Sequence, residues 1–109
     1  MYGFHTNRVD LNHADVVAAL RRVPGVFVKS TAPVGDGFPD LFVTRGGFVY
    51  MMEVKSKGGE LSDDEVAFAS ECGVRVYVVY SPEEAVKVVA YNADEVLKAL
   101  AQAGGRDAR

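Results

Sequence analysis

Hydrophobic and polar positions alternate with a two-residue period in the middle of the chain, and this pattern predicts a β-hairpin. The strands are expected at Leu41–Thr44 and Phe48–Lys55. Arg45, Gly46 and Gly47 supply the turn, because paired glycines tolerate the positive φ angles of tight hairpins. Successive strand side chains point to opposite faces, and both faces of the second strand are mostly apolar. We therefore expect this strand to lie inside a sheet that is covered on both sides.

A helical period flanks the hairpin, with capping residues at the helix starts and Gly or Pro at several ends. The expected helices are Asn12–Val23, Asp63–Cys72, a segment that begins at Pro82, and Ala93–Ala103. Shorter strands are expected at Val26–Ser30 and Arg75–Tyr80. This order predicts an α/β fold with a mixed sheet between helices, in which the last strand returns parallel to the hairpin. The stripe of the second helix is expected in the core, with Cys72 as a buried thiol: Val66, Phe68, Ala69 and Cys72.

The composition is that of one ordinary globular domain. The 109 residues are 49% hydrophobic and 25% charged, so we expect a single domain with an N-terminal arm at 1–9 and a disordered tail at 104–109. No apolar run reaches the ~20 residues that span a bilayer, and no signal peptide is evident. Cys72 is the only cysteine, which excludes an internal disulfide. A cytoplasmic location without membrane contact is the expectation.

Three ionisable residues interrupt the apolar hairpin. Asp40 precedes the first strand, and Glu53 and Lys55 share one face of the second strand with Val49 and Met51. Charges on an interior surface are costly unless they are paired or bind a cation. Two interpretations follow, a catalytic site that binds a divalent cation and an interior salt bridge that serves only structure.

The same residues resemble the signature of the PD-(D/E)xK nuclease superfamily. Pro39-Asp40 is followed, after twelve residues, by Glu53-Val54-Lys55. Within the superfamily the chain is most similar to archaeal-type Holliday junction resolvases and to stand-alone VRR-NUC nucleases of phages. The resemblance covers about residues 10–90, including the first helix, the run from Lys29 into Asp40, and the later helix–strand–helix segment. It implies a restriction-endonuclease-like core.

The resemblance also implies a set of metal-binding and catalytic residues. Asp40, Glu53 and the backbone carbonyl of Val54 would bind Mg²⁺, with Mn²⁺ as a substitute. Lys55 would position or help to deprotonate the attacking water. Asp15, on the first helix, would contribute through a water molecule, and the alternative is a plain helix-capping acid.

Further residues are assigned more loosely by the resemblance. Glu65 stands where related nucleases often have Gln beside the lysine. It either pairs with Lys55 or completes a capping box with Ser62. Ser30 matches a serine near the scissile phosphate in resolvases, or is a structural hydroxyl. His13 is expected to be a solvated residue of the first helical turn, and Asp36 a turn residue.

The expected partner is branched double-stranded DNA. Candidate phosphate contacts are Lys29, Lys57 and Arg45, with Arg21, Arg22 and Arg75 behind them, and each has the alternative of an ordinary surface charge. The net charge of −3 argues against simple electrostatic DNA binding. The favoured function is a Mg²⁺-dependent, structure-selective endonuclease that resolves four-way junctions as a C2 homodimer. The alternatives are a general, flap-cleaving or nicking repair nuclease, and a catalytically silent nucleic-acid-binding module.

Overall fold

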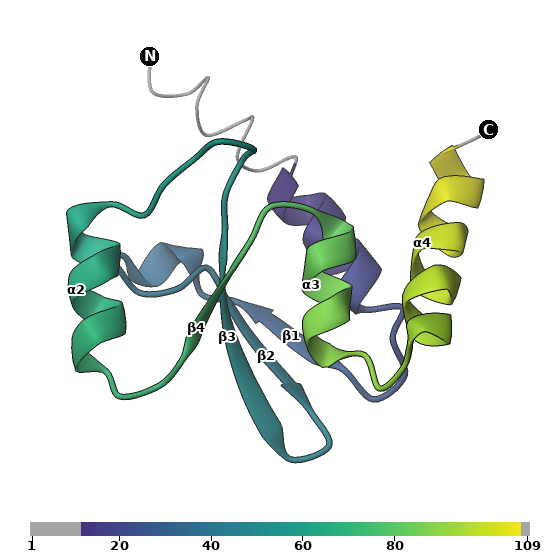
Figure 1. Cartoon of the computed structure of the whole chain (residues 1–109), viewed down its shortest axis with the longest axis horizontal. Coiled ribbons are helices and arrows are strands. Elements are labelled where there is room, and N and C mark those ends of the chain that lie inside the picture. Colours follow the sequence, from purple (N-terminus) through teal and green to yellow (C-terminus); the bar gives the residue numbers. More distant parts are fainter. Residues whose placement is uncertain (1–11, 108–109) are drawn as a thin grey trace.

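The structure, a computed structural model, describes residues 12–107, and the expected N-terminal arm lies outside them (Figure 1). A first helix, residues 12–20, is followed by eight further elements. These are β1 (Phe27–Ser30), the 3₁₀ turn η1 (Ala32–Val34), β2 (Leu41–Arg45), β3 (Phe48–Val54), α2 (Asp63–Glu71), β4 (Val76–Val79), α3 (Pro82–Val89) and α4 (Ala93–Asp107). The predicted element order is confirmed. Within the described residues, no helix is long and apolar enough to cross a membrane.

The four strands form one mixed sheet in the order β1-β2-β3-β4. The β1–β2 and β2–β3 pairs are antiparallel, and β3–β4 is parallel, as predicted. Arg45 pairs with Phe48, which leaves Gly46 and Gly47 as a two-residue turn with φ angles of 59° and 86°. These left-handed angles explain why the turn uses two glycines.

Helices flank both faces of the sheet, but they cover the two faces unequally. The first helix, α3 and α4 lie on one side and α2 lies on the other (Figure 1). The core fills the first side, where buried strand residues meet buried helix residues. Its members include Val16, Leu20, Leu41, Val43, Met52, Val54, Val86 and Val89.

The α2 side is thinly covered, which corrects two expectations. No residue of α2 is buried, and Val66 is 48% exposed, so the predicted core stripe of this helix is wrong. Phe48 and Val49 are 67% and 49% exposed, so β3 is buried only from Met51 to Val54. Apolar alternation shows which faces could be covered, but the length and placement of α2 decide how far the cover extends.

The C-terminal helix is longer than expected. α4 continues to Asp107, so residues 104–107 of the predicted tail are helical. Gly104 and Gly105 lower helix propensity by about 1 kcal/mol each. A glycine ends a helix when it takes the left-handed conformation of a C-cap, whereas these two lie within the helix.

Candidate functional site

Asp40 and Glu53 come together because of the hairpin register. Leu41 pairs with Met52, so the next pair toward the open end of the hairpin consists of Asp40 and Glu53. Residues directly opposite each other in antiparallel strands share a face. The backbone N–H of Val54 donates a 2.9 Å hydrogen bond to Oδ2 of Asp40, which fixes the Asp40 carboxylate against the end of β3.

Glu53 is an acid in an unusually unfavourable place. Its side chain is 3% exposed, and Glu53 and Arg45 are the two buried charged residues in the described part of the chain. Burial raises the pKa of Glu53 to about 9, helped by a hydrogen bond with Glu65 and by the charge and hydrogen bond of Asp40. Without a cation, Glu53 is therefore protonated at neutral pH and shares its proton with neighbouring carboxylates.

Among residues 12–101, Lys55 is the one basic side chain joined to this cluster by an ion pair. Its Nζ lies 2.8 Å from Oε1 of Glu65 and 3.8 Å from Oε2 of Glu53. Burial alone would lower the pKa of Lys55, but the hydrogen bond and charge of Glu65 raise it overall. Burial would raise the pKa of Glu65, but the hydrogen bonds from Lys55 and the Ser62 backbone lower it. The lysine is therefore charged and directed at the two acids.

Both interpretations of Glu65 are correct at once. Ser62 caps α2 and accepts from the Glu65 N–H at 3.2 Å, while Oε1 of Glu65 accepts from the Ser62 N–H at 2.8 Å. The same Oε1 contacts Lys55. The first turn of α2 therefore attaches the lysine to the start of the helix.

The loop before β2 positions α2 against the acids. Gly37 has φ of 81°, and a Cβ at this position would collide with the backbone carbonyl of Asp64. Phe38 packs against Phe68 of α2, with ring centroids 5.1 Å apart. Asp36, with φ of 54°, is an exposed turn residue. Close backbone approach at Gly37 brings Asp40 and Glu65 into one cluster from distant parts of the chain.

The first helix is attached to the same end of the sheet. Asn12 lies within this helix, and its side-chain amide donates a 3.0 Å hydrogen bond to the Lys55 carbonyl. Asp15 is exposed, and among the described residues no hydrogen bond or ion pair joins it to Asp40 or Glu53. The water-mediated role expected of Asp15 therefore stays a prediction.

The cluster suits a hard divalent cation with an incomplete protein shell. Three carboxylates, from Asp40, Glu53 and Glu65, face one ammonium group from Lys55, and this leaves two negative charges when all the acids are ionised. No group of three or more potential ligands in residues 12–107 is arranged as a ready cage. Mg²⁺ keeps several waters and is usually bound by one or two carboxylates. Asp40, Glu53 and the Val54 carbonyl, at the end of β3, fit that requirement.

Arg45 is not available for a phosphate contact, which corrects the expectation from the sequence. Its side chain is 5% exposed, and its guanidinium makes a bidentate pair with Glu95 at 2.6 and 2.8 Å. It also donates to the Val89 carbonyl at 3.1 Å and lies 3.6 Å from the ring centroid of Tyr91. These contacts raise the pKa of Arg45, first through the Glu95 hydrogen bond, and the same bond lowers the pKa of Glu95 to about 2.

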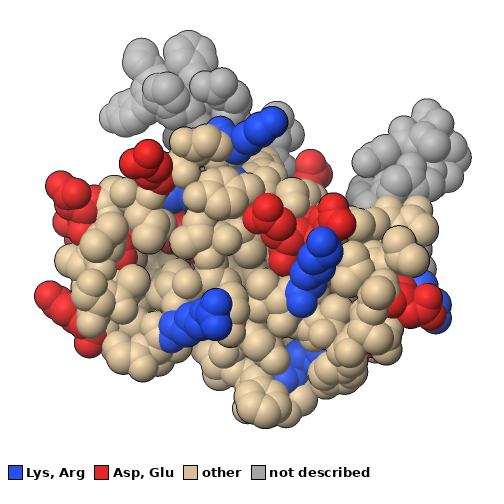
Figure 2. Space-filling model, viewed as in Figure 1, with Lys and Arg blue, Asp and Glu red and all other residues tan. Residues whose placement is uncertain are grey.

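The other candidate DNA contacts lie on the surface. Lys29, Ser30 and Lys57 are exposed, the first two on β1 and the third in the turn after β3. Basic side chains are separate from one another on the face shown in Figure 2, and acidic side chains gather over α2. Recognition by one broad basic surface is not supported on this face.

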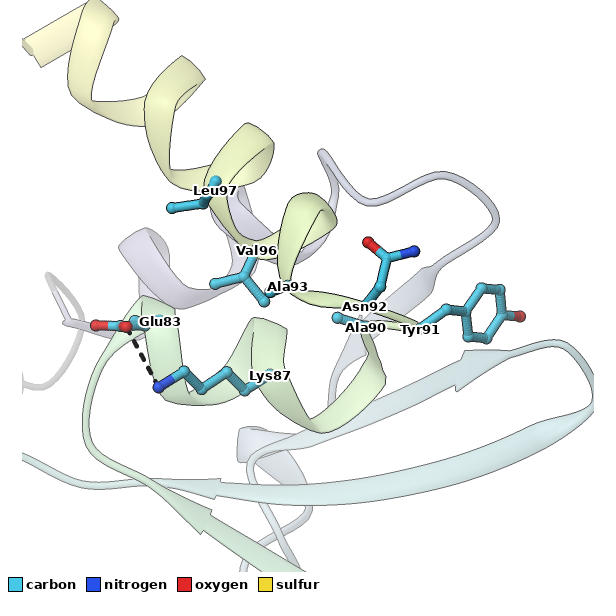
Figure 3. Close-up of a pocket in the computed structure, with 8 residues that line it drawn as sticks. All are labelled: Glu83, Lys87, Ala90, Tyr91, Asn92, Ala93, Val96 and Leu97. Carbon is cyan, nitrogen blue, oxygen red and sulfur yellow. Dashed lines mark ion pairs between the residues drawn. The ribbon is translucent and has the colours of Figure 1, made fainter.

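Two of the larger hollows lie outside the carboxylate cluster. One of about 380 Å³ lies between α3 and α4, with the Glu83–Lys87 ion pair at its rim and Val96 and Leu97 along its side (Figure 3). It is mainly apolar and holds no acid–lysine cluster of the kind described above. The other, of about 370 Å³, contains His13 and Ser30. Neither hollow was predicted from the sequence. One forms between the consecutive helices α3 and α4, and the other forms where the first helix meets the end of β1 and η1.

No protein-family model, curated protein or solved structure matches this chain. The carboxylate–lysine cluster is therefore the feature of the molecule that points to a function.

Proposed function

We propose that this protein is a Mg²⁺-dependent DNA endonuclease that selects branched DNA, most specifically a Holliday junction resolvase. The observation that carries the proposal is the buried Glu53 carboxyl, opposite Asp40 and 3.8 Å from the Lys55 ammonium. A structural ion pair needs one acid for one base, whereas this cluster gathers three acids around one lysine. A divalent cation would balance the excess charge.

Each residue of the cluster has a distinct role in phosphodiester hydrolysis. A bound Mg²⁺ would neutralise charge on the phosphate and acidify a coordinated water. Asp40, Glu53 and the Val54 carbonyl would bind the ion, and the Val54 N–H orients the Asp40 carboxylate toward it. Lys55 would donate a hydrogen bond to the attacking water or to a phosphate oxygen. Glu65 is a positioning residue, because it binds the same ammonium group at 2.8 Å from the start of α2.

The preference for a four-way junction depends on the resemblance and on symmetry. A junction presents two equivalent strands, so paired cleavage requires two active sites and hence a C2 homodimer. Residues 12–107 pack around one core, and recognition of DNA shape by this domain itself is the mode that we propose. Nicking or flap cleavage on the same cluster is the second candidate, because the cluster alone does not specify the branch.

The experiment compares labelled four-way junction, flap, linear duplex and single-stranded DNA, each with Mg²⁺ or EDTA. Paired symmetric nicks on the junction, absent in EDTA, are expected. Glu53→Gln should abolish them, and the matched control Glu83→Gln, at an exposed residue of α3, should retain them. Cleavage of every substrate would favour a general nuclease. Junction binding without any metal-dependent cleavage would refute the enzyme and favour a silent binding module.

A further inference from the structure

The sheet face that carries the carboxylate–lysine cluster continues toward the hairpin turn as an open aromatic surface. Because strand side chains alternate, Phe42 and Thr44 of β2 share this face with Asp40. The register places Phe27 of β1 directly opposite Thr44, on the same face. Phe27 is 55% exposed, and Phe42 is partly exposed. Of the described helices, α2 is the one on this side of the sheet, and the hairpin turn extends beyond it (Figure 1).

Phe27 and Phe42 form an ordered aromatic pair on this surface. Their ring centroids lie 6.4 Å apart, and the ring planes meet at 75° in an edge-to-face arrangement. This is one of the geometries that aromatic rings prefer, so each ring helps to fix the orientation of the other. Phe27 therefore presents an aromatic surface to solvent in a defined position, and a flat ring that stacks on it pays little for ordering the side chain.

A basic side chain lies beside the aromatic pair. Lys29 is directly opposite Phe42 and two residues from Phe27, so all three share one face. Lys29 is exposed, and within residues 12–101 its ammonium makes no ion pair. A nucleotide matches this combination, because its phosphate pairs with a cation while its base stacks on an aromatic ring. An apolar protein surface would instead desolvate the ammonium without a partner.

The aromatic pair is continuous with the cluster along β2. Asp40 and Phe42 are two residues apart on one face, which corresponds to about 7 Å at a rise of about 3.4 Å per residue. The backbone N–H of Thr31 donates to the Asp40 carbonyl at 2.7 Å, so the pairing of the two chain segments extends as far as the cluster. A DNA strand that rises about 3.4 Å per nucleotide and has a phosphate at the cluster reaches the aromatic pair within about two nucleotides.

We propose that Phe27, held in place by Phe42, stacks on an unpaired base of the branched DNA close to the scissile phosphate, with Lys29 beside the backbone of that nucleotide. The inference rests on the proposed function and deepens it, because it states which feature of the branch is recognised. Bases within a duplex have both ring faces covered by their neighbours. The base that stacks on Phe27 must therefore be open, and opening costs least for a base that is already unpaired.

The first test measures binding separately from cleavage. The full-length Asp40→Asn, Glu53→Gln double variant is titrated with a labelled four-way junction at fixed salt, because this background lacks two carboxylates of the proposed reaction. Phe27→Leu should weaken binding about tenfold, as expected for loss of one stacked base, and Phe27→Tyr, which keeps a ring, should bind within about twofold of the background. The matched control is Phe48→Leu, which removes a ring that is 67% exposed on the opposite face of the hairpin and should change affinity less than about twofold.

A second set of titrations locates the base. Single abasic sites are introduced at each position around the branch point. One position should weaken binding about tenfold when Phe27 is present, and this penalty should vanish in Phe27→Leu, because the stacking partner is then missing from both molecules. An unchanged affinity in Phe27→Leu, or an equal penalty at every position in both proteins, would overturn the base site. Thermal melting checks that each variant is folded.

Sedimentation without DNA tests the other use of an exposed aromatic surface, a contact between copies of this chain. Phe27→Leu should sediment as its parent protein does. Weaker self-association of Phe27→Leu would assign the aromatic pair to a protein interface and overturn the base site.

The outcomes separate the base site from the nuclease. An abasic penalty that depends on Phe27, without cleavage by the wild-type protein, would retain the base site and refute the nuclease. Normal cleavage of the junction with no dependence of binding on Phe27 would retain the nuclease and refute the base site. Absence of binding to every DNA tested would refute both.

Discussion

The central hairpin buries a charged residue at each end, and the two ends compensate that charge differently. At the turn, Arg45 is met by one carboxylate, from Glu95, at 2.6 and 2.8 Å. At the open end, Glu53 is surrounded by two further carboxyl groups, and the lysine that approaches it at 3.8 Å makes its shorter contact with Glu65. One end is balanced within the protein, and the other retains an excess of negative charge. Stability explains the first arrangement, whereas the second is the basis for the cation that we propose.

The difference also appears in the direction of the pKa shifts. At the turn, the hydrogen bond from Arg45 lowers the pKa of Glu95 to about 2, so that acid is ionised throughout the neutral range. At the open end, burial and the nearby acids raise the pKa of Glu53 to about 9. Glu53 of β3 is buried among acids, whereas Glu95 of α4 is partly exposed beside a base, so burial and neighbours together set the opposite directions of the two pKa shifts.

The largest expected effect is on cleavage. Asp40→Asn or Glu53→Gln should reduce Mg²⁺-dependent cleavage of a four-way junction by at least about 1000-fold, because each removes a charged ligand of the proposed ion. Glu95→Gln, at the balanced end, should leave cleavage within a few-fold of the wild type. Rates are measured under single-turnover conditions with folded protein. Near-wild-type cleavage by Asp40→Asn or Glu53→Gln would show that the open end of the hairpin is not a catalytic site.

The next largest effect is on stability. Here the turn end of the hairpin should matter more than the open end. Arg45→Met should lower the melting temperature by roughly 10 °C, because it strips the ion pair from Glu95 and the hydrogen bond from Val89. The matched control is Lys87→Met, which breaks an exposed ion pair of 3.3 Å on α3. Exposed pairs contribute about 0–1 kcal/mol, so this control should melt within a few degrees of the wild type. Equal losses in the two variants would show that the Arg45 pair is not structural.

Local features explain most of what the sequence could predict. The Gly46-Gly47 turn, the Ser62–Glu65 capping box and Pro82 at the start of α3 each depend on residues within a few positions, and all three are found where expected. The pairing of Asp40 with Glu53 at the open end of the hairpin could also be predicted, because the two residues are close in sequence and antiparallel pairing of β2 with β3 brings them opposite each other.

The errors arise from contacts that sequence spacing does not encode. Arg45 was expected in the turn, after a strand that ends at Thr44. It is instead the last residue of β2, and its partner Glu95 is fifty residues away. The sequence of α2 contains apolar residues at helical spacing, but how much of them is buried depends on how the helix packs against the sheet. That packing leaves every residue of α2 at least partly exposed. Glu65 was weighed between two roles, and a single carboxylate oxygen performs both.

A third effect uses pH to test the unbalanced end without metal. In EDTA, the folded protein retains the Glu53 proton up to a pKa of about 9, whereas the unfolded chain loses it near the ordinary value of 4.5. The folded state therefore binds more protons between these values, and stability from this group falls as pH rises through that range. Glu53→Gln lacks the ionisation, so its melting temperature should exceed that of the wild type by an amount that grows from pH 5 to pH 9, reaching roughly 5–10 °C.

Two controls sharpen the pH experiment. Glu83→Gln, at an exposed acid, should follow the wild-type profile. Mg²⁺ should raise the melting temperature of the wild type near pH 8 and leave that of Glu53→Gln unchanged, since binding to the folded state alone stabilises it. A constant difference between Glu53→Gln and the wild type across the range would refute the raised pKa.

The smallest expected effect separates the two roles of Glu65. Glu65→Gln can still complete the capping box, so its melting temperature should stay close to that of the wild type, but it loses the ion pair that orients Lys55. Cleavage should fall about tenfold, because the ammonium is less well positioned, an effect smaller than loss of a metal ligand. Ser62→Ala makes the opposite change: it removes the cap, costs about 1 kcal/mol of stability, and leaves the Lys55–Glu65 pair in place. If Ser62→Ala lowered cleavage as much as Glu65→Gln at a temperature where both are folded, then the order of α2, rather than the charge of Glu65, would position the lysine.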